Sequence, residues 1–303
     1  MSLEGLLAFP LTTFTADLEL DLDAYADHLE SHLAADVGAL FVACGTGEFS
    51  ALSPDELRAV LRRAREVVAG RVPIWVGAGG GPAHARSGVA MARAEGADGV
   101  LLLPPYLVTG PQGGLVDHVR FALRDNDVPV IVYHRTPGVF GPDAAVRLLG
   151  IPSVAGVKDG FGDVDLMTRI VTAIRAAGGE DFLFFNGLPT AEVSARAYRA
   201  IGVARYSSAV HCFVPEIAGR FHRALRDGED AVADRLLTDF YLPLVALRDE
   251  TPGFAVSLVK AGARLRGQKV GGVRPPLGEP SASQLERLER IVAGGLDALA
   301  EVG

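Results

Sequence analysis

The sequence of 303 residues predicts a (β/α)8 barrel of parallel strands with a C-terminal helical extension. Short apolar runs alternate with amphipathic helical stretches over the first two thirds of the chain, and there are eight such runs. After residue 210 the strand-like runs stop and only helical patterns continue. A doubly wound open sheet is the alternative, but it would need a glycine-rich dinucleotide turn after the first strand. Residues 9–12, Phe-Pro-Leu-Thr, do not form one.

The eight apolar runs have the length of barrel strands. They are predicted at residues 5–11, 39–44, 72–76, 99–103, 128–133, 154–158, 182–185 and 203–207. Because eight parallel strands in strict alternation with helices are the number that closes a barrel, we expect a closed sheet.

The helices between and after these strands carry recognisable signals. Ser53, Pro54 and Glu56 form a capping box with proline at the first helical position. Past the barrel, helices are predicted at residues 215–226, 230–247, 254–265 and 283–300. No low-complexity linker intervenes. We therefore expect residues 1–210 to form the barrel that carries the active site, and residues 211–303 to form a helical extension packed on it.

Composition excludes several classes of function. A net charge of −8 gives no basic face for nucleic acid, and no apolar run approaches the ~18 residues of a membrane span. Residues 1–5 lack the positive region of a secretory signal, so we expect a cytoplasmic protein.

The potential metal ligands follow no metal-binding pattern. Cys44 and Cys212 lie far apart in the sequence. His28 and His32 share a helix face, but no acidic third ligand is evident. We expect a solvated face there rather than a metal site.

Lys158 is one of three lysines in a chain with 26 arginines, and it ends the sixth predicted strand. Arginine stays protonated, whereas lysine loses its proton when desolvated and then attacks carbonyl carbons. Active sites of (β/α)8 barrels lie at the C-terminal ends of the strands. Lys158 is therefore a candidate nucleophile, and an ion pair with Asp159 is the alternative.

Other strand ends supply further candidates. Tyr133 ends the fifth strand, where a phenol could move protons, or it could be a core tyrosine. The turn Gly45-Thr46-Gly47 follows the second strand and offers amides and a hydroxyl for a carboxylate, or it is a plain turn. We expect Glu48 to serve the N-terminal region of the next helix. Asn186, Gly187, Ser207 and Ser208 are candidate substrate-binding residues; the two serines have no partner base for a hydrolase.

Three motifs at these strand ends resemble one superfamily. They are Gly-Thr-Gly-Glu at residues 45–48, Tyr133, and Gly-Val-Lys-Asp at residues 156–159. They resemble the dihydrodipicolinate synthase/N-acetylneuraminate lyase superfamily of class I aldolases. The resemblance covers nearly the whole chain, including residues 256–262 and 273–277.

This resemblance implies a mechanism and an assembly. Lys158 would form a Schiff base with a 2-oxo acid, Tyr133 would be the acid/base, and Thr46 with the adjacent amides would hold the substrate carboxylate. The imine would supply the electron sink, so no metal or organic cofactor is expected. The resemblance also implies a homotetramer built as a dimer of dimers.

Within the superfamily, the chain is most similar to 5-dehydro-4-deoxyglucarate dehydratase, a decarboxylating hydro-lyase. Residues 47–52, 103–107, 185–192 and 206–210 carry this similarity. The synthase branch usually has a second tyrosine where this chain has Leu107, and an arginine where it has Gly138. The expected reaction converts 5-dehydro-4-deoxy-D-glucarate to 2,5-dioxopentanoate, carbon dioxide and water, with Asn186, Ser207 and Ser208 at the distal end of the substrate.

The chain also departs from the dehydratase branch. His134 stands where an asparagine is usual, and His211 and Cys212 replace a phenylalanine and an asparagine. A retro-aldolase or dehydratase acting on another 2-oxo-3-deoxy sugar acid, and a dihydrodipicolinate synthase-like enzyme, are therefore alternatives. A non-catalytic barrel that binds a sugar acid is a third, and retention of both Lys158 and Tyr133 weighs against it. The role of Arg135 is open.

Overall fold

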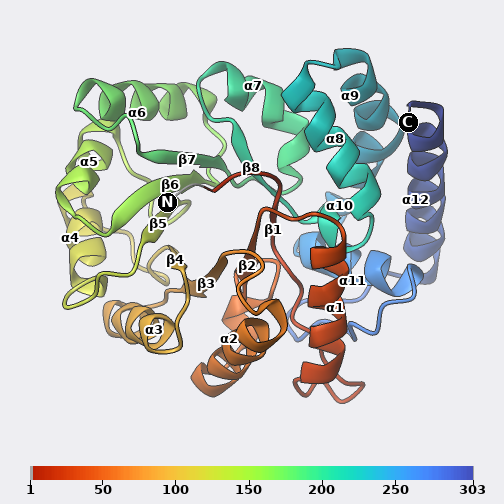
Figure 1. Ribbon diagram of the computed structural model, residues 1–303, viewed down its shortest axis with the longest axis horizontal. Coiled ribbons are helices and arrows are strands. Elements are labelled where there is room, and N and C mark those ends of the chain that lie inside the picture. Colours follow the sequence, from red (N-terminus) through yellow and green to blue (C-terminus); the bar gives the residue numbers. More distant parts are fainter. Residues whose placement is uncertain (1–2, 303) are drawn as a thin grey trace. The chain divides into compact units, whose positions relative to one another are not determined.

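The computed structural model describes residues 3–302, and it confirms the predicted barrel. Eight strands close into a barrel in the order β1 to β8, and helices follow the strands along the chain (Figure 1). The strands are β1 (Leu7–Ala8), β2 (Ala39–Val42), β3 (Ile74–Ala78), β4 (Gly99–Leu102), β5 (Val130–His134), β6 (Val154–Asp159), β7 (Leu183–Asn186) and β8 (Arg205–Ser208).

The helices that alternate with these strands begin after β1. They are α1 (Leu22–Ala34), α2 (Pro54–Val68), α3 (Pro82–Ala94), α4 (Gln112–Ala122), α5 (Pro142–Val146), α6 (Val164–Ala176) and α7 (Ala195–Ala200). The extension contains α8 (Pro215–Asp227), α9 (Asp230–Leu236), α10 (Leu242–Arg248), α11 (Phe254–Leu265) and α12 (Ala282–Val302). Across residues 3–302, none of the helices has both the length and the apolar character that a membrane span needs.

By contacts, the chain divides into two compact units. The first contains the chain up to Val72 together with the chain from Ser208 onward, and the second runs from Pro73 to Ser207. The predicted domain boundary after residue 210 stays a prediction, and residues 1, 2 and 303, which it includes, lie outside the described part of the chain.

Two elements differ from the sequence prediction. β1 has two residues instead of seven, and Pro10, which has no N–H for a ladder hydrogen bond, follows it closely. The helix expected over residues 230–247 is interrupted by η5 (Leu237–Tyr241), a π-helical turn. Pro243 explains the interruption, because it cannot donate to the carbonyl of Asp239 and its ring would collide with that group in an α-helix.

The first unit confirms the predicted capping box. Ser53 Oγ accepts from the Glu56 amide (3.2 Å), and Glu56 Oε2 accepts from the Ser53 amide (2.8 Å). In the same unit α12 packs against the π-helical turn. A Cβ atom added to Gly295 would lie 2.5 Å from the Phe240 ring, so this contact requires glycine.

In the second unit, β5, β6 and β7 lie side by side in the green part of the chain (Figure 1). The register between β5 and β6 changes within the strands. Val130 pairs with Val154, but the next residue, Ile131, pairs with Gly156. Ala155 is therefore an extra residue, a β-bulge on β6.

The bulge determines which residues meet at the ends of the two strands. If β6 had no extra residue after the Val130–Val154 pair, Tyr133 would pair with Val157. With it, Tyr133 pairs with Lys158. Because a shift of one residue moves a side chain to the other face of a sheet, the bulge puts Tyr133 and Lys158 on the same face.

Gly156 makes this bulge sterically possible. A Cβ atom at Gly156 would lie 2.4 Å from the carbonyl oxygen of Leu183 on β7, and that backbone oxygen cannot rotate away as a side chain could. β6 must approach β7 this closely to keep the strands paired after the extra residue.

We predict that Gly156→Ala lowers the free energy of unfolding by about 1–3 kcal/mol, because the added methyl group overpacks a fixed backbone contact. Gly150→Ala is the matched control, since a Cβ atom there has nothing within 4 Å. Chemical denaturation of both variants measures the effect. Equal stability of the two variants would contradict the close approach of β6 and β7.

Candidate functional site

Lys158 and Tyr133, both predicted as catalytic residues, lie together in the second unit. Lys158 Nζ is 4.2 Å from the centre of the Tyr133 ring, and the two side chains are 5% and 6% exposed. Both residues stand at the C-terminal ends of adjacent parallel strands. The structure thus brings an amine and a phenol to the end of the barrel where active sites form.

Two polar groups hold the Tyr133 hydroxyl. It donates to the carbonyl oxygen of Gly187 (3.0 Å), and it accepts from Arg135 Nη1 (3.2 Å). Burial acts to raise the pKa of Tyr133, but the charges of Lys158 and Arg135 and their hydrogen bonds outweigh it, so this pKa lies below its ordinary value of 10.0. The phenol is therefore easier to deprotonate than a buried tyrosine alone.

Two glycines leave space for these side chains. A Cβ atom at Gly187 would lie 2.6 Å from Lys158 Nζ, and one at Gly160 would lie 2.6 Å from the Tyr133 hydroxyl. Gly187, predicted as a substrate-binding residue, thus contributes its carbonyl oxygen and its lack of a side chain.

Asp159 faces away from Lys158 because adjacent residues of a strand point to opposite faces. Its Oδ2 accepts from the Tyr198 hydroxyl (2.5 Å), and its Oδ1 accepts from the Phe161 amide (2.8 Å). These contacts hold the end of β6 from behind. An ion pair with Lys158, the alternative considered from the sequence, is therefore not the role of this carboxylate.

His134 belongs to the same network behind the site. It pairs with Asp159 in the register of β5 and β6, with Nε2 3.9 Å from Asp159 Oδ1. Its Nδ1 accepts from the Phe140 amide (3.0 Å). Burial lowers the pKa of His134, although Asp159 and Asp163 act in the opposite direction. We assign a neutral imidazole on the face of β5 opposite to Tyr133.

The remaining predicted substrate-binding residues have partners within their own loops. The Asn186 amide donates to the Ala191 carbonyl (3.1 Å) and Ser194 Oγ (2.8 Å), and its oxygen accepts from the Leu188 amide. Ser207 Oγ is 3.5 Å from the Asn186 carbonyl. Within the first unit, buried Ser208 accepts from the His211 amide (3.3 Å). Their contacts with substrate stay predictions.

The predicted carboxylate-binding turn follows β2 in the first unit. Gly45 is exposed, Thr46 is half-buried and Gly47 is buried. The Gly47 carbonyl accepts from Thr12 Oγ1 (2.7 Å), and a Cβ atom there would lie 3.1 Å from the Pro10 carbonyl. The turn is thus packed on one side while Gly45 and Thr46 remain accessible.

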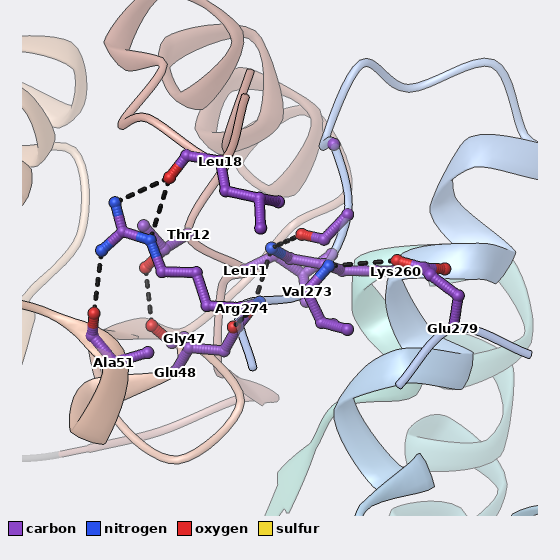
Figure 2. Close-up of polar contacts among 12 residues, drawn as sticks. Leu11, Thr12, Leu18, Gly47, Glu48, Ala51, Lys260, Val273, Arg274 and Glu279 are labelled. Carbon is purple, nitrogen blue, oxygen red and sulfur yellow. Dashed lines mark hydrogen bonds and ion pairs between the residues drawn. The ribbon is translucent and has the colours of Figure 1, made fainter. Parts of the chain in front are cut away.

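Glu48 anchors this turn to the C-terminal extension, which corrects the expectation that it would serve the next helix (Figure 2). Its Oε1 lies 2.7 Å from Lys260 Nζ, and its Oε2 accepts from the Arg274 amide (3.0 Å). Both carboxylate and ammonium are almost completely buried. Ser53 caps α2 instead.

Lys260 and Arg274 complete the anchor. Lys260 Nζ also donates to the Gly272 carbonyl (2.6 Å) and lies 4.1 Å from the centre of the Phe14 ring. The Arg274 guanidinium lies over the same ring and donates to the carbonyls of Leu18 and Ala51 (Figure 2). Burial lowers the pKa of Lys260, and Glu48 acts in the opposite direction.

Sequence reasoning missed this anchor, although a signal was present. The scarcity of lysine that singled out Lys158 applies equally to Lys260, which lies in an apolar helix. Lys260 and Glu48 are more than 200 residues apart in the sequence, so only the fold shows that one lysine faces a phenol and the other a carboxylate.

The helix face of His28 and His32 is buried, so the expected solvated face is wrong. His28 is 2% exposed and His32 is 0% exposed. His32 Nδ1 lies 2.7 Å from His211 Nδ1, and His28 Nδ1 lies 2.6 Å from Gln268 Oε1. The C-terminal extension covers this face of α1.

A closed parallel barrel with an amine and a phenol at adjacent C-terminal strand ends is the architecture of a TIM-barrel enzyme. The chain belongs to the dihydrodipicolinate synthetase family, which it matches over residues 2–294.

Relatives and solved structures agree with this membership. The chain is 52% identical to "Probable 5-dehydro-4-deoxyglucarate dehydratase 1" of Streptomyces coelicolor, over 96% of this chain and 92% of that protein. It is 44% identical to "Probable 5-dehydro-4-deoxyglucarate dehydratase" of Rhizobium rhizogenes, over 95% of this chain and 94% of that protein. The dihydrodipicolinate synthase of Bacillus clausii shares the fold, with a TM-score of 0.88 and 24% identity over 96% of this chain and 97% of that one.

We predict that Lys260→Met lowers the free energy of unfolding by about 3–5 kcal/mol, because it leaves the Glu48 carboxylate buried and unpaired. Lys269→Met is the matched control: Lys269 is exposed, so the change should stay within about 0.5 kcal/mol. Denaturant titration measures both. The double variant Glu48→Gln/Lys260→Met should recover part of the loss, and a loss no larger than the control's would rule out the anchor.

Proposed function

We propose that this protein is a Schiff-base-forming lyase that dehydrates and decarboxylates 5-dehydro-4-deoxy-D-glucarate to 2,5-dioxopentanoate. The observation that carries the proposal is the position of Lys158 Nζ over the Tyr133 ring. The dehydratase names of relatives at about 50% identity support the substrate. An amine beside an acidified phenol suits imine chemistry followed by proton transfer.

The first step is condensation of the amine with the substrate. The unprotonated Lys158 amine attacks the oxo carbon, and the resulting carbinolamine loses water to give an iminium ion. Tyr133 is the nearest identified acid/base for the proton that the departing hydroxyl requires. The Gly187 carbonyl and Arg135 fix the direction of its hydroxyl.

Dehydration follows because the iminium withdraws electrons. The methylene carbon next to the iminium loses a proton to the Tyr133 phenolate, and an enamine forms. The enamine electrons then expel the hydroxyl group from the next carbon, which leaves as water with the proton from Tyr133. The iminium and the new carbon–carbon double bond are conjugated.

Decarboxylation uses the same electron sink. The bond to the distal carboxylate breaks, carbon dioxide leaves, and its electrons move through the double bond to the imine nitrogen. Protonation of this dienamine and hydrolysis of the imine release 2,5-dioxopentanoate and regenerate Lys158. One substrate thus gives one water, one carbon dioxide and one dioxo acid in net balance.

The predicted binding residues are assigned to the two ends of the substrate. Thr46 and the amides of the Gly45–Gly47 turn would hold the carboxylate next to the imine, and the Glu48–Lys260 anchor supports this role because it fixes the turn. Ser207 and Ser208 would contact the distal end, and Asn186 would act there through its loop contacts. No cofactor is proposed for these steps, because the imine accepts the electrons.

A cytoplasmic homotetramer, arranged as a dimer of dimers, is part of the proposal. Both cysteines are free and buried, in keeping with a reducing compartment. Tyr106 and Leu107, in the loop after β4, are 70% and 80% exposed, which suits a contact between subunits.

Borohydride reduction tests the imine. With pyruvate, the reduced adduct should form on Lys158 and be located by peptide mass spectrometry. Lys158→Ala should lose it, whereas the control Lys269→Ala should keep it. Absence of an adduct with pyruvate and with 5-dehydro-4-deoxy-D-glucarate would refute the mechanism and favour a sugar-acid-binding barrel. Products then decide the reaction: carbon dioxide with 2,5-dioxopentanoate supports the dehydratase, and released pyruvate supports a retro-aldolase.

Tyr133→Phe should lower kcat by about 10²–10⁴-fold while the borohydride adduct still forms. Arg135→Gln should raise the pKa of Tyr133, since it removes a positive charge that lowers it. The limb of the kcat/KM profile that Tyr133→Phe abolishes should therefore move to higher pH. Arg124→Gln replaces an exposed arginine and is the control, so this limb should stay in place. An unmoved limb in Arg135→Gln would exclude Arg135 as the group that acidifies the phenol.

A further inference from the structure

The first unit contains a buried cluster of nitrogen and sulfur ligands that the proposed chemistry does not use. α1 carries His28 and His32 one helical turn apart, and η4 (Val210–Cys212) brings Cys212 to them. One ligand atom from each of these three residues lies within 4.8 Å of the other two. The side chains are 0–2% exposed.

We propose that His28, His32 and Cys212 bind a borderline-soft divalent metal ion, with zinc as the expected occupant. His28 Nε2 and His32 Nε2 are 3.2 Å apart. Two nitrogens of a tetrahedral zinc site are ~3.3 Å apart when each is ~2.0–2.1 Å from the ion. The two rings therefore already have the separation of shared ligands.

Hydrogen bonds fix the tautomer of His28. Gln268 Nε2 donates to the Cys212 carbonyl (2.9 Å), so Gln268 Oε1 is the end that accepts from His28 Nδ1 (2.6 Å). His28 Nε2 then carries no hydrogen, in agreement with its acceptance from the Leu11 amide (3.1 Å). Its lone pair is therefore available to a metal ion in place of the Leu11 amide.

Without a metal, the ring nitrogens of His32 and His211 cannot all form hydrogen bonds. The contact between His32 Nε2 and His28 Nε2 is a hydrogen bond only when His32 carries its hydrogen on Nε2, and His32 Nδ1 then accepts from His211 Nδ1 (2.7 Å). His211 Nε2 is then left without a hydrogen. In that arrangement this buried nitrogen has no hydrogen to donate to the Ala35 carbonyl, the acceptor for the His211 ring. An unmet polar atom at such depth is unfavourable.

A metal ion reverses the direction of the hydrogen bond between His32 and His211. His32 Nε2 binds the ion, so the hydrogen of His32 moves to Nδ1 and donates to His211 Nδ1. His211 then carries its hydrogen on Nε2, beside the Ala35 carbonyl. The Ala35 carbonyl accepts from the His211 ring. Outer hydrogen bonds of this kind are typical of metal-bound histidines.

Cys212 supplies an anionic third ligand, which was not evident from the sequence around His28 and His32. Its Sγ donates to the Phe9 carbonyl (3.3 Å), and metal binding replaces this bond and releases the thiol proton. The Leu11 amide is also a hydrogen-bond donor to the sulfur. Leu11 thus has a second acceptor when His28 Nε2 turns to the ion.

The position of the cluster indicates a structural role. It joins α1 to the segment that follows β8, and its ligand side chains are buried. Three protein ligands leave one position of a tetrahedral ion for a non-protein ligand. Such an ion enters during folding and stabilises the folded state.

The test uses untagged protein produced in zinc-supplemented medium, because a histidine tag would bind zinc itself. Elemental analysis should find one zinc per chain. Cys212→Ser and His32→Asn should each reduce this content at least tenfold, whereas Cys44→Ser, which changes the other buried cysteine, should retain it. Cobalt-substituted protein should show a thiolate-to-cobalt charge-transfer band that Cys212→Ser abolishes.

Thermal unfolding provides a second readout. Added zinc should raise the Tm of chelator-treated wild-type protein and of Cys44→Ser, but not that of Cys212→Ser. Less than a tenth of an equivalent of zinc in wild-type protein, or an equal content in Cys212→Ser, overturns the proposal. If His32→Asn fails to fold, the isosteric Cys212→Ser variant and the cobalt spectrum still decide. Borohydride trapping on Lys158 tests the proposed function, and its result does not depend on whether zinc binds.

Discussion

The candidate site depends on one extra residue in one strand. Ala155 shifts the pairing of β6 with β5 by one position, and only the shifted register sets Lys158 opposite Tyr133. The shift is possible because Gly156 has no side chain to meet the Leu183 carbonyl. Gly187 and Gly160 then leave the volume that the amine and the phenol fill. The juxtaposition of the amine and the phenol is thus specified by backbone features as much as by the two side chains.

The two buried lysines show how environment separates residues of one type. Lys260 faces a carboxylate, a carbonyl and an aromatic ring, and these contacts give it a structural role. Lys158 faces the phenol of Tyr133, whose pKa is lowered by this amine and by Arg135 against the effect of burial. The first arrangement holds an amine against a carboxylate, and the second places an amine beside a phenol with a lowered pKa.

The sequence predicted what depends on local pattern. Strand count, the capping box at Ser53 and the strand-end positions of Lys158 and Tyr133 all follow from periodicities within short segments. The bulge at Ala155 could not be predicted, because it is a relation between two strands. The same holds for Glu48 with Lys260 and for His32 with His211, pairs that are brought together only when the C-terminal extension packs. Burial of the His28 face was missed for this reason.

The three residues that depart from the dehydratase pattern all have partners inside the protein. His134 lies on the face of β5 opposite to Tyr133 and is held by Asp159 and the Phe140 amide. The side chains of His211 and Cys212 contact His32 and the Phe9 carbonyl inside the first unit. All three side chains are buried among protein partners. They therefore belong to internal packing and, for His211 and Cys212, to the histidine cluster.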